Sequence, residues 1–161
     1  MPKLLLLRDY HFPIMCSFPN QSFPVSLRGS WFGLNQVFRS RLKGLGITPA
    51  QYTTLRHICE FDGDFLNQRT LAELLVSNEN NLTAILHLLE QKGWILRKKL
   101  SMDRRCKAIV STSKGRKLFL DAQVIAQRLQ GEILNTYTKE EEETLFTCLE
   151  ACCLNLQEME E

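Results

Sequence analysis

Apolar residues recur at helical spacing over most of the chain. The first clear stripe lies between Trp31 and Leu42, where the spacing is close to the helical period of about 3.6 residues. Gly44 and Gly46 follow this stripe, and glycine is common just beyond the last turn of a helix. The pattern therefore predicts an amphipathic helix that ends close to Leu42.

Three further helices are predicted from their start signals. Each begins with a threonine followed three residues later by Gln or Glu, a spacing that lets the two side chains cap backbone N–H groups reciprocally. These capping boxes occupy residues 48–51, 70–73 and 138–141. They predict helices over about 48–60, 70–76 and 138–157.

The segment between the second and third capping boxes carries a different pattern. Ser77 or Asn78 is the predicted cap of another helix, which ends at Gly93. Two short helices joined by a tight turn are typical of a helix-turn-helix. Residues 94–100 and 107–112 are predicted as two strands around the polar turn 101–106, and helix returns from Lys114 to about Leu134. The sequence thus predicts a mainly α fold with a small β-hairpin wing.

The chain is expected to form one domain with an appended arm. Residues 1–29 hold four of the five prolines and show no period of either helix or strand, so they are predicted as an N-terminal arm. Met15 within this arm is a second candidate start. Residues 30–161 form the predicted domain, in which helices of about 30–60 and 114–157 flank a winged helix-turn-helix of about 65–113.

Charge is distributed unevenly along the chain. The formal net charge of the 161 residues is +2. Residues 92–117 contain ten basic residues and one acidic residue, which gives this segment +9 and leaves −7 for the remainder. A concentrated basic segment on an otherwise acidic chain is typical of a protein that binds a polyanion, and we expect double-stranded DNA.

Several classes of protein are disfavoured by composition and motifs. No stretch approaches the roughly 18 apolar residues that span a bilayer, so no membrane association is expected. The opening MPKLLLLRDY has too few apolar residues before Arg8 for a signal peptide, and the expected compartment is cytoplasmic. The sequence has no glycine-rich phosphate loop, nucleophile elbow or His-Glu metal motif, so no enzyme is predicted.

Several short motifs occur in an order that resembles one known family. They are Leu-Gly-Ile-Thr-Pro-Ala-Gln-Tyr at 45–52, Leu-Glu-Gln-Lys-Gly-Trp at 89–94, Asp-Arg-Arg at 103–105, Ser-Thr at 111–112 and Lys-Gly-Arg at 114–116. Together with the helix pair, they resemble MarR-family transcriptional regulators over residues 30–157. The resemblance implies a homodimeric winged helix-turn-helix protein whose first helix and last two helices form the dimerisation domain. It also implies binding to a pseudo-palindromic operator.

The helix after the tight turn is the predicted recognition helix. Its apolar residues share one face, and its polar residues face away from them. The predicted DNA-contacting residues are Asn78, Asn80, Asn81, Thr83, Ala84 and His87. Asn can bond to adenine, and Ala or the Thr methyl can contact a thymine methyl, so an A·T-biased half-site is expected. Many relatives carry an arginine on this helix, whereas residues 78–91 here contain no Arg or Lys, so the wing must contribute more of the binding.

The wing supplies the cations that the recognition helix lacks. By resemblance, Asp103 and Arg105 match the family's Asp-x-Arg motif, which implies that Arg105 enters the minor groove while Asp103 orients it. An alternative interpretation is a pair that only stabilises the hairpin turn. The other basic residues of the wing are predicted phosphate contacts: Arg97, Lys98, Lys99, Arg104 and Lys107.

Six cysteines leave two interpretations open. They are Cys16, Cys59, Cys106, Cys148, Cys152 and Cys153, and no pair has the Cys-x-x-Cys spacing of a zinc ribbon. The plainer interpretation makes those of the last helix small hydrophobic residues in a dimer interface. The other makes the cysteines a redox sensor or the ligands of an iron–sulfur cluster. Cys106 is a further redox candidate, because nearby cations would lower its pKa.

The sequence also allows a small aromatic effector and a second function. Five residues are candidates to line a pocket for such a ligand, although aromatics at helical spacing are more commonly core: Trp31, Phe38, Tyr52, His57 and Phe61. The alternative function is a winged-helix dimer that binds another protein and no DNA, which the uncharged recognition helix would favour. The operator, the signal and the choice between repression and activation stay open.

Overall fold

The computed structural model describes residues 23–63, 65–75, 79–99 and 107–159. The chain divides into two compact units, and the division falls between residues 126 and 127. The described part of the larger unit covers residues 23–126, and that of the smaller unit covers 127–159.

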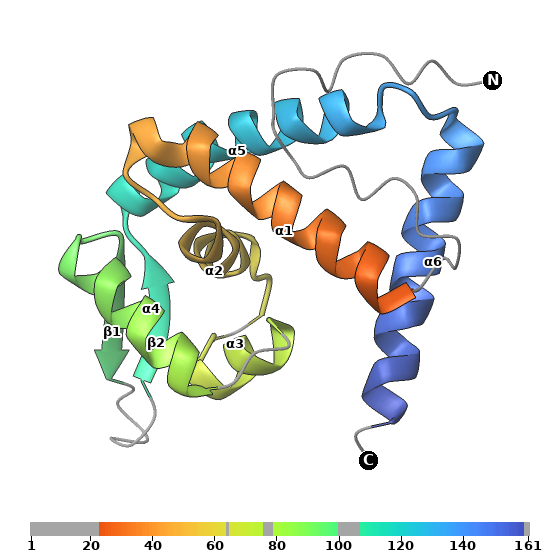
Figure 1. Ribbon diagram of the computed structural model, residues 1–161. Helices are drawn as coiled ribbons and strands as arrows, with labels where there is room; N and C mark the ends of the chain where they lie inside the picture. Colours follow the sequence, from red (N-terminus) through yellow and green to blue (C-terminus); the bar gives the residue numbers. More distant parts are fainter. Residues whose placement is uncertain (1–22, 64, 76–78, 100–106, 160–161) are drawn as a thin grey trace. The chain divides into compact units, whose positions relative to one another are not determined.

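The larger unit contains a helical lobe and a β-hairpin (Figure 1). Its elements are α1 (Phe23–Leu42), the 3₁₀ turn η1 (Lys43–Leu45), α2 (Pro49–Glu60), α3 (Gln68–Leu74), α4 (Glu79–Gln91), β1 (Ile95–Lys99), β2 (Lys107–Ser111) and the first part of α5 (Ser113–Leu134). The smaller unit holds the rest of α5 and α6 (Lys139–Glu158). The predicted class, mainly α with a hairpin wing, is confirmed.

Two of the three predicted capping boxes are present. Thr48 accepts from the backbone N–H of Gln51 while the Gln51 side chain accepts from Thr48, and Thr138 and Glu141 form the same arrangement at α6. The box predicted at residues 70–73 is wrong. Asn67 caps α3 instead, since its side chain accepts from the N–H of Thr70 at 2.9 Å. Asparagine is among the best N-cap residues, so the helix begins before Thr70 can serve as its cap.

The first helix starts earlier than the sequence pattern predicts. It begins at Phe23, within the segment expected to be an arm without helical structure. Pro24 is compatible with this start because a first-turn residue has no intrahelical use for its N–H. Val25 and Leu27, in this part of the helix, are exposed.

The turn between α4 and β1 follows the prediction. Gly93 takes the left-handed conformation with φ of 69°. The N–H of Trp94 donates to the Leu89 carbonyl, and the N–H of Gly93 donates to that of Glu90, both at 2.9 Å. This pair of bonds is a Schellman motif, which gives partners to carbonyls that the helix end leaves open.

The hydrophobic core lies in the larger unit. Leucines from α1, α2, α3 and α4 are fully buried there together with the first residue of β1: Leu42, Leu55, Leu71, Leu82, Leu86, Leu89 and Ile95. In the smaller unit α6 has no buried residue. Among the described helices, none is both long enough and apolar enough to cross a membrane.

The hairpin is bound to the helical lobe at two places. β1 and β2 are antiparallel, with Arg97 opposite Ile109. The N–H of Ile109 donates to the Leu66 carbonyl at 2.7 Å, which links β2 to the segment just before α3. At the base, the Thr112 hydroxyl donates to the Gly93 carbonyl at 2.8 Å. The hairpin base is therefore fixed against both helices of the helix-turn-helix.

Candidate nucleic-acid interface

Most apolar side chains of α4 lie on its buried face and the polar ones on its exposed face, as the sequence predicts. Leu82, Leu86 and Leu89 are buried, and Ile85 is half-buried. The described members of the predicted DNA-contacting set all have exposed side chains: Asn80, Asn81, Thr83, Ala84 and His87. Asn78 lies outside the described residues. The exposed face is polar and carries small groups, which suits hydrogen bonds and methyl contacts with base edges.

Two side chains of this face are held by neighbouring glutamines. The Gln68 side chain donates from Nε2 to the Thr83 hydroxyl at 2.7 Å, which joins the start of α3 to α4. Gln91 Nε2 donates to His87 Nε2 at 2.9 Å, one turn along α4. The role of Gln68 is not predictable from local sequence, because its partner lies fifteen residues away along the chain.

The basic segment divides between the two ends of the hairpin. The strand register pairs Lys99 with Lys107 toward the turn and Ile95 with Ser111 at the base. At about 3.3 Å per residue, these two ends are about 13 Å apart. Lys98 and Lys107 have exposed side chains. The tip residues Asp103, Arg104 and Arg105 lie outside the described residues, as does the side chain of Lys99.

Two lysines beyond the hairpin base bind carbonyl oxygens of their own chain. Lys92 Nζ donates to the Gly46 carbonyl at 2.8 Å and lies 4.5 Å from the centre of the Trp94 ring. Lys114 Nζ donates to the Lys92 carbonyl at 2.9 Å. These carbonyls follow the ends of η1 and α4, where intrahelical partners run out. These two hydrogen bonds therefore also stabilise the fold around the hairpin base.

Arg97 differs from the other predicted phosphate contacts. Its side chain is only 19% exposed, and its Nε lies 3.4 Å from a carboxylate oxygen of Glu90. Glu90 belongs to the last turn of α4, so this ion pair joins the recognition helix to the wing. Neither residue spacing nor charge pattern predicts this pair.

The four cysteines that the structure describes lie on two helices, one on α2 and three on α6. Cys59 is half-buried on α2, whereas Cys148 and Cys153 are exposed and Cys152 is half-buried on α6. Burial raises the pKa of the Cys59 thiol, and a hydrogen bond from Ser111 opposes that shift. Within the described ranges, no three His, Cys, Asp or Glu side chains gather as a metal site would require. Cys16 and Cys106 lie outside these ranges.

Two of the five predicted pocket residues, Phe38 and Tyr52, pack against each other. Phe38 and Tyr52 meet edge to face with ring centres 5.2 Å apart, and Tyr52 stacks on Phe119 at 6.3 Å. Burial raises the pKa of the Tyr52 hydroxyl. His57 donates from Nδ1 to the Thr53 carbonyl at 2.9 Å. Trp31, by contrast, is 66% exposed. The packing of Phe38 and Tyr52 agrees with the plainer interpretation as core.

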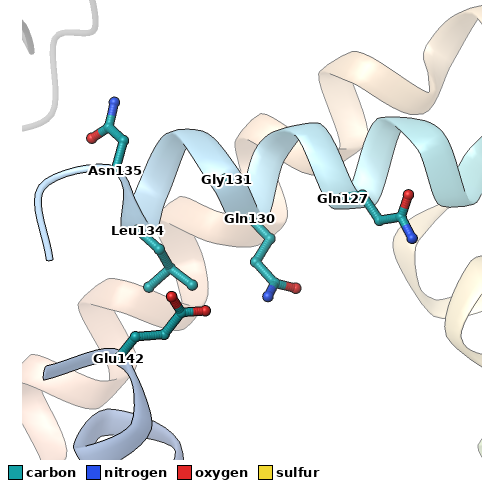
Figure 2. Close-up of a pocket in the computed structure, with 6 residues that line it drawn as sticks. All are labelled: Gln127, Gln130, Gly131, Leu134, Asn135 and Glu142. Atoms are coloured by element: carbon teal, nitrogen blue, oxygen red, sulfur yellow. The ribbon is translucent and has the colours of Figure 1, made fainter. Parts of the chain in front are cut away.

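Two open cavities lie elsewhere. One, of about 390 Å³ in the smaller unit, is lined by residues that include Gln127, Gln130, Leu134 and Glu142 (Figure 2). Figure 2 shows Leu134 and Glu142 close together and Asn135 directed away from them. The other, of about 550 Å³ in the larger unit, lies at the hairpin base, and its lining includes Trp94, Lys117 and Asp121. The five residues predicted to bind an aromatic effector line neither cavity.

Comparison with known proteins agrees with this geometry. Residues 47–107 match the family model described as MarR family. A Bacillus subtilis (strain 168) protein named an uncharacterized HTH-type transcriptional regulator, YybA, is 25% identical over 124 residues, which are 77% of this chain and 81% of that protein.

Solved structures show the same fold over most of the chain. The MepR–DNA complex of S. aureus matches with a TM-score of 0.80 and 24% identity, over 84% of this chain and 99% of that chain. The transcriptional repressor CouR, bound to a 23-mer DNA duplex, matches with a TM-score of 0.74 and 22% identity, over 82% of this chain and 92% of that chain. The helix-turn-helix and the hairpin agree with these matches: this chain has a winged helix-turn-helix fold, and its residues 47–107 are similar to the MarR family.

Proposed function

We propose that this protein is a transcriptional regulator that binds duplex DNA as a homodimer at a pseudo-palindromic operator. In each copy α4 enters the major groove, and the hairpin lies over the adjacent backbone with Arg105 in the minor groove. The observation that carries this proposal is the exposed polar face of α4 beside a hairpin whose described side chains include the exposed cations Lys98 and Lys107. The relatives MepR and CouR, which were solved with DNA, support it at the level of the family.

In this proposal α4 recognises the base sequence through hydrogen bonds and methyl contacts from small side chains. Asn80 and Asn81 can each bond to adenine, and Thr83 and Ala84 can contact thymine methyl groups. Because α4 contributes no cation, the phosphate contacts come from the wing. An A·T-rich half-site also narrows the minor groove and strengthens its attraction for an arginine such as Arg105.

Selection of binding sites from a randomised duplex pool tests this function. We expect recovery of an inverted repeat with A·T-rich half-sites whose centres are about one helical turn apart. R105A should weaken binding to the recovered duplex at least tenfold, because each lost base or phosphate contact costs roughly 1–3 kcal/mol. Recovery of G·C-rich sites only would contradict the proposed readout, and unchanged affinity of R105A would remove the wing from it.

The homodimer is supported by apolar side chains that a single copy leaves exposed. α1 exposes Trp31 and Phe32, and α6 exposes Leu154 and Leu156. Sedimentation of the purified chain should give twice its mass of 18.6 kDa. L154E should shift the equilibrium toward the monomer and reduce operator affinity, whereas E150Q on the same helix should change neither. A monomeric wild-type chain that still binds the inverted repeat would contradict the dimer.

A second candidate function is protein binding without DNA binding. It is favoured by the absence of Lys and Arg from residues 78–91 and by the bonds that hold Thr83 and His87 within the chain. A gel shift with the selected duplex and excess competitor DNA separates the candidates. Specific retention under competition supports the regulator, and complete loss supports the interaction module.

Control by thiol oxidation is a further part of the proposal. Exposed Cys148 and Cys153 on α6 support it, because an exposed thiol is accessible to oxidants. An iron–sulfur cluster would need ligands from a second copy or from cysteines outside the described residues. Anaerobic purification followed by an absorption spectrum and metal analysis tests the cluster. DNA binding before and after peroxide treatment tests the thiols, and indifference to peroxide would remove redox control.

A further inference from the structure

Arg97 lies on the inward face of the hairpin. Side chains alternate between the two faces of a strand, so Arg97 shares a face with Ile95, two residues before it. Ile95 is fully buried, whereas the alternate residues Leu96 and Lys98 are exposed. The Arg97 guanidinium is therefore partly withdrawn from solvent, while the adjacent Lys98 projects outward on the opposite face.

The partner of Arg97 comes from the recognition helix. Arg97 Nε is fully buried and lies 3.4 Å from Oε2 of Glu90, whose side chain is 39% exposed. Among the described residues, this Nε has no hydrogen-bond partner, so the carboxylate is the group that balances its charge. A partly buried ion pair is sensitive to the loss of either partner, because the remaining charge is left uncompensated.

The position of Glu90 is otherwise unfavourable. It lies in the last turn of α4, where the helix dipole favours cations, and that turn contains no basic residue. A carboxylate in the lobe that faces DNA would also repel phosphates. Both penalties are reduced when Arg97 neutralises the carboxylate, so the pair accounts for an acid at this position.

The pair adds a side-chain connection between α4 and β1 to the backbone contacts at the hairpin base. The chain itself links α4 to β1 through the turn at Gly93, and the ion pair joins the two elements beyond that turn. We propose that Arg97 is a positioning residue that, through Glu90, fixes the direction of the wing relative to the recognition helix. Arg97 thereby sets DNA specificity without contacting phosphate. This inference rests on the proposed function, since it assigns a role within DNA recognition.

Two adjacent cations of β1 provide a matched test. R97Q and K98Q each remove one positive charge, from opposite faces of the strand. The probes are the duplex recovered by selection and a scrambled duplex of the same composition. R97Q should lose about tenfold in affinity for the selected duplex, with little change for the scrambled one and an unchanged salt dependence. K98Q should weaken binding to both and reduce the log–log salt slope by about 0.9 for each copy.

For the variant E90Q, simple charge repulsion and the proposed positioning role predict opposite changes in DNA affinity. If the carboxylate only repelled DNA, E90Q would bind both duplexes more tightly. As a positioning partner it should instead lose about tenfold on the selected duplex, and the double variant E90Q/R97Q should lose no more than the worse single variant. E73Q removes an acid whose partner, Arg69, lies on the same helix, so it serves as the control.

The outcomes separate this inference from the proposed function. A wild-type chain that shows no preference for the selected duplex overturns both. A wild-type preference, with R97Q behaving like K98Q or E90Q binding more tightly to both duplexes, overturns the positioning role alone. Thermal melting checks that each variant folds. If R97Q does not fold, E90Q and R97K test the positioning role instead. R97K should keep the wild-type salt slope and lose only part of the specificity.

Discussion

Gly115 lies directly against the backbone carbonyl of Trp94. A Cβ built on Gly115 would fall far inside van der Waals contact with the carbonyl oxygen and 2.8 Å from its carbon. The same region is tied by the Thr112 hydroxyl, which accepts from the N–H of Gly115 at 3.0 Å. The start of α5 and the base of the hairpin thus meet at a distance that only glycine permits.

This close approach predicts a large difference between two glycines of one helix. G115A should lower the free energy of unfolding by about 1–3 kcal/mol or more, because the backbone of α5 or Trp94 must move. G131A, for which an added Cβ meets nothing within 4 Å, should raise it by about 0.5–1 kcal/mol through helix propensity. Urea unfolding measures both. Equal effects of the two variants would contradict the close approach.

The cap of α3 gives a second test. N67A should destabilise the protein by about 1 kcal/mol, because the N–H of Thr70 loses its acceptor. T70A should cost at most a few tenths of a kcal/mol, since alanine is a better helix former and Thr70 is not the cap. Thermal unfolding of the two variants, measured in parallel, compares their losses of stability. A larger loss for T70A than for N67A would restore the capping box that the sequence alone predicted.

The two faces of α4 should respond differently to truncation. L86A removes a fully buried side chain and should cost about 2–5 kcal/mol. L88A, two residues away and 44% exposed, should cost less than about 1 kcal/mol. Denaturant titration of each variant is the measurement, with circular dichroism to verify folding. Similar losses at both positions would mean that Leu88 is covered in solution.

Cys59 should be the slowest described thiol to react. Burial raises its pKa, so less thiolate is present at neutral pH than for an ordinary cysteine. Alkylation followed by peptide mass spectrometry should show Cys148 modified well before Cys59, and S111A should slow Cys59 further by removing a bond that favours the thiolate. Faster reaction at Cys59 than at Cys148 would contradict this order.

The same pKa shift predicts a dependence of stability on alkaline pH. The folded state holds the Cys59 proton more tightly than the unfolded state, so the stability does not depend on this group well below the ordinary pKa of a cysteine. As pH rises above that value, the unfolded chain ionises first and stability falls until the folded pKa is reached. C59A should show a smaller loss of stability between pH 8 and 10 than the wild type, measured by urea unfolding at each pH.

Local signals predicted much of the fold because they act within a few residues. Thr48 and Thr138 cap helices through bonds to residues three positions away, and Gly93 ends α4 by its own backbone conformation. The buried face of α4 follows from the helical period alone. Where two local signals competed, as at Asn67 and Thr70, the pattern gave the wrong start. At α1 the residues before Trp31 show no helical period, so the sequence predicted the helix but not its start at Phe23.

The sequence by itself determined the elements, their order, the polar face of α4 and the basic segment around the hairpin. Only the tertiary structure decided the partners: Glu90 for Arg97, Gln68 for Thr83, and backbone carbonyls for Lys92 and Lys114. The reason is physical. A helix cap or a periodic stripe depends on neighbours along the chain, whereas Lys92 and Gly46 are 46 residues apart and meet only because the core between them has packed. Charge counted along a sequence therefore indicates a class of ligand, and packing decides which of those charges remain available to bind it.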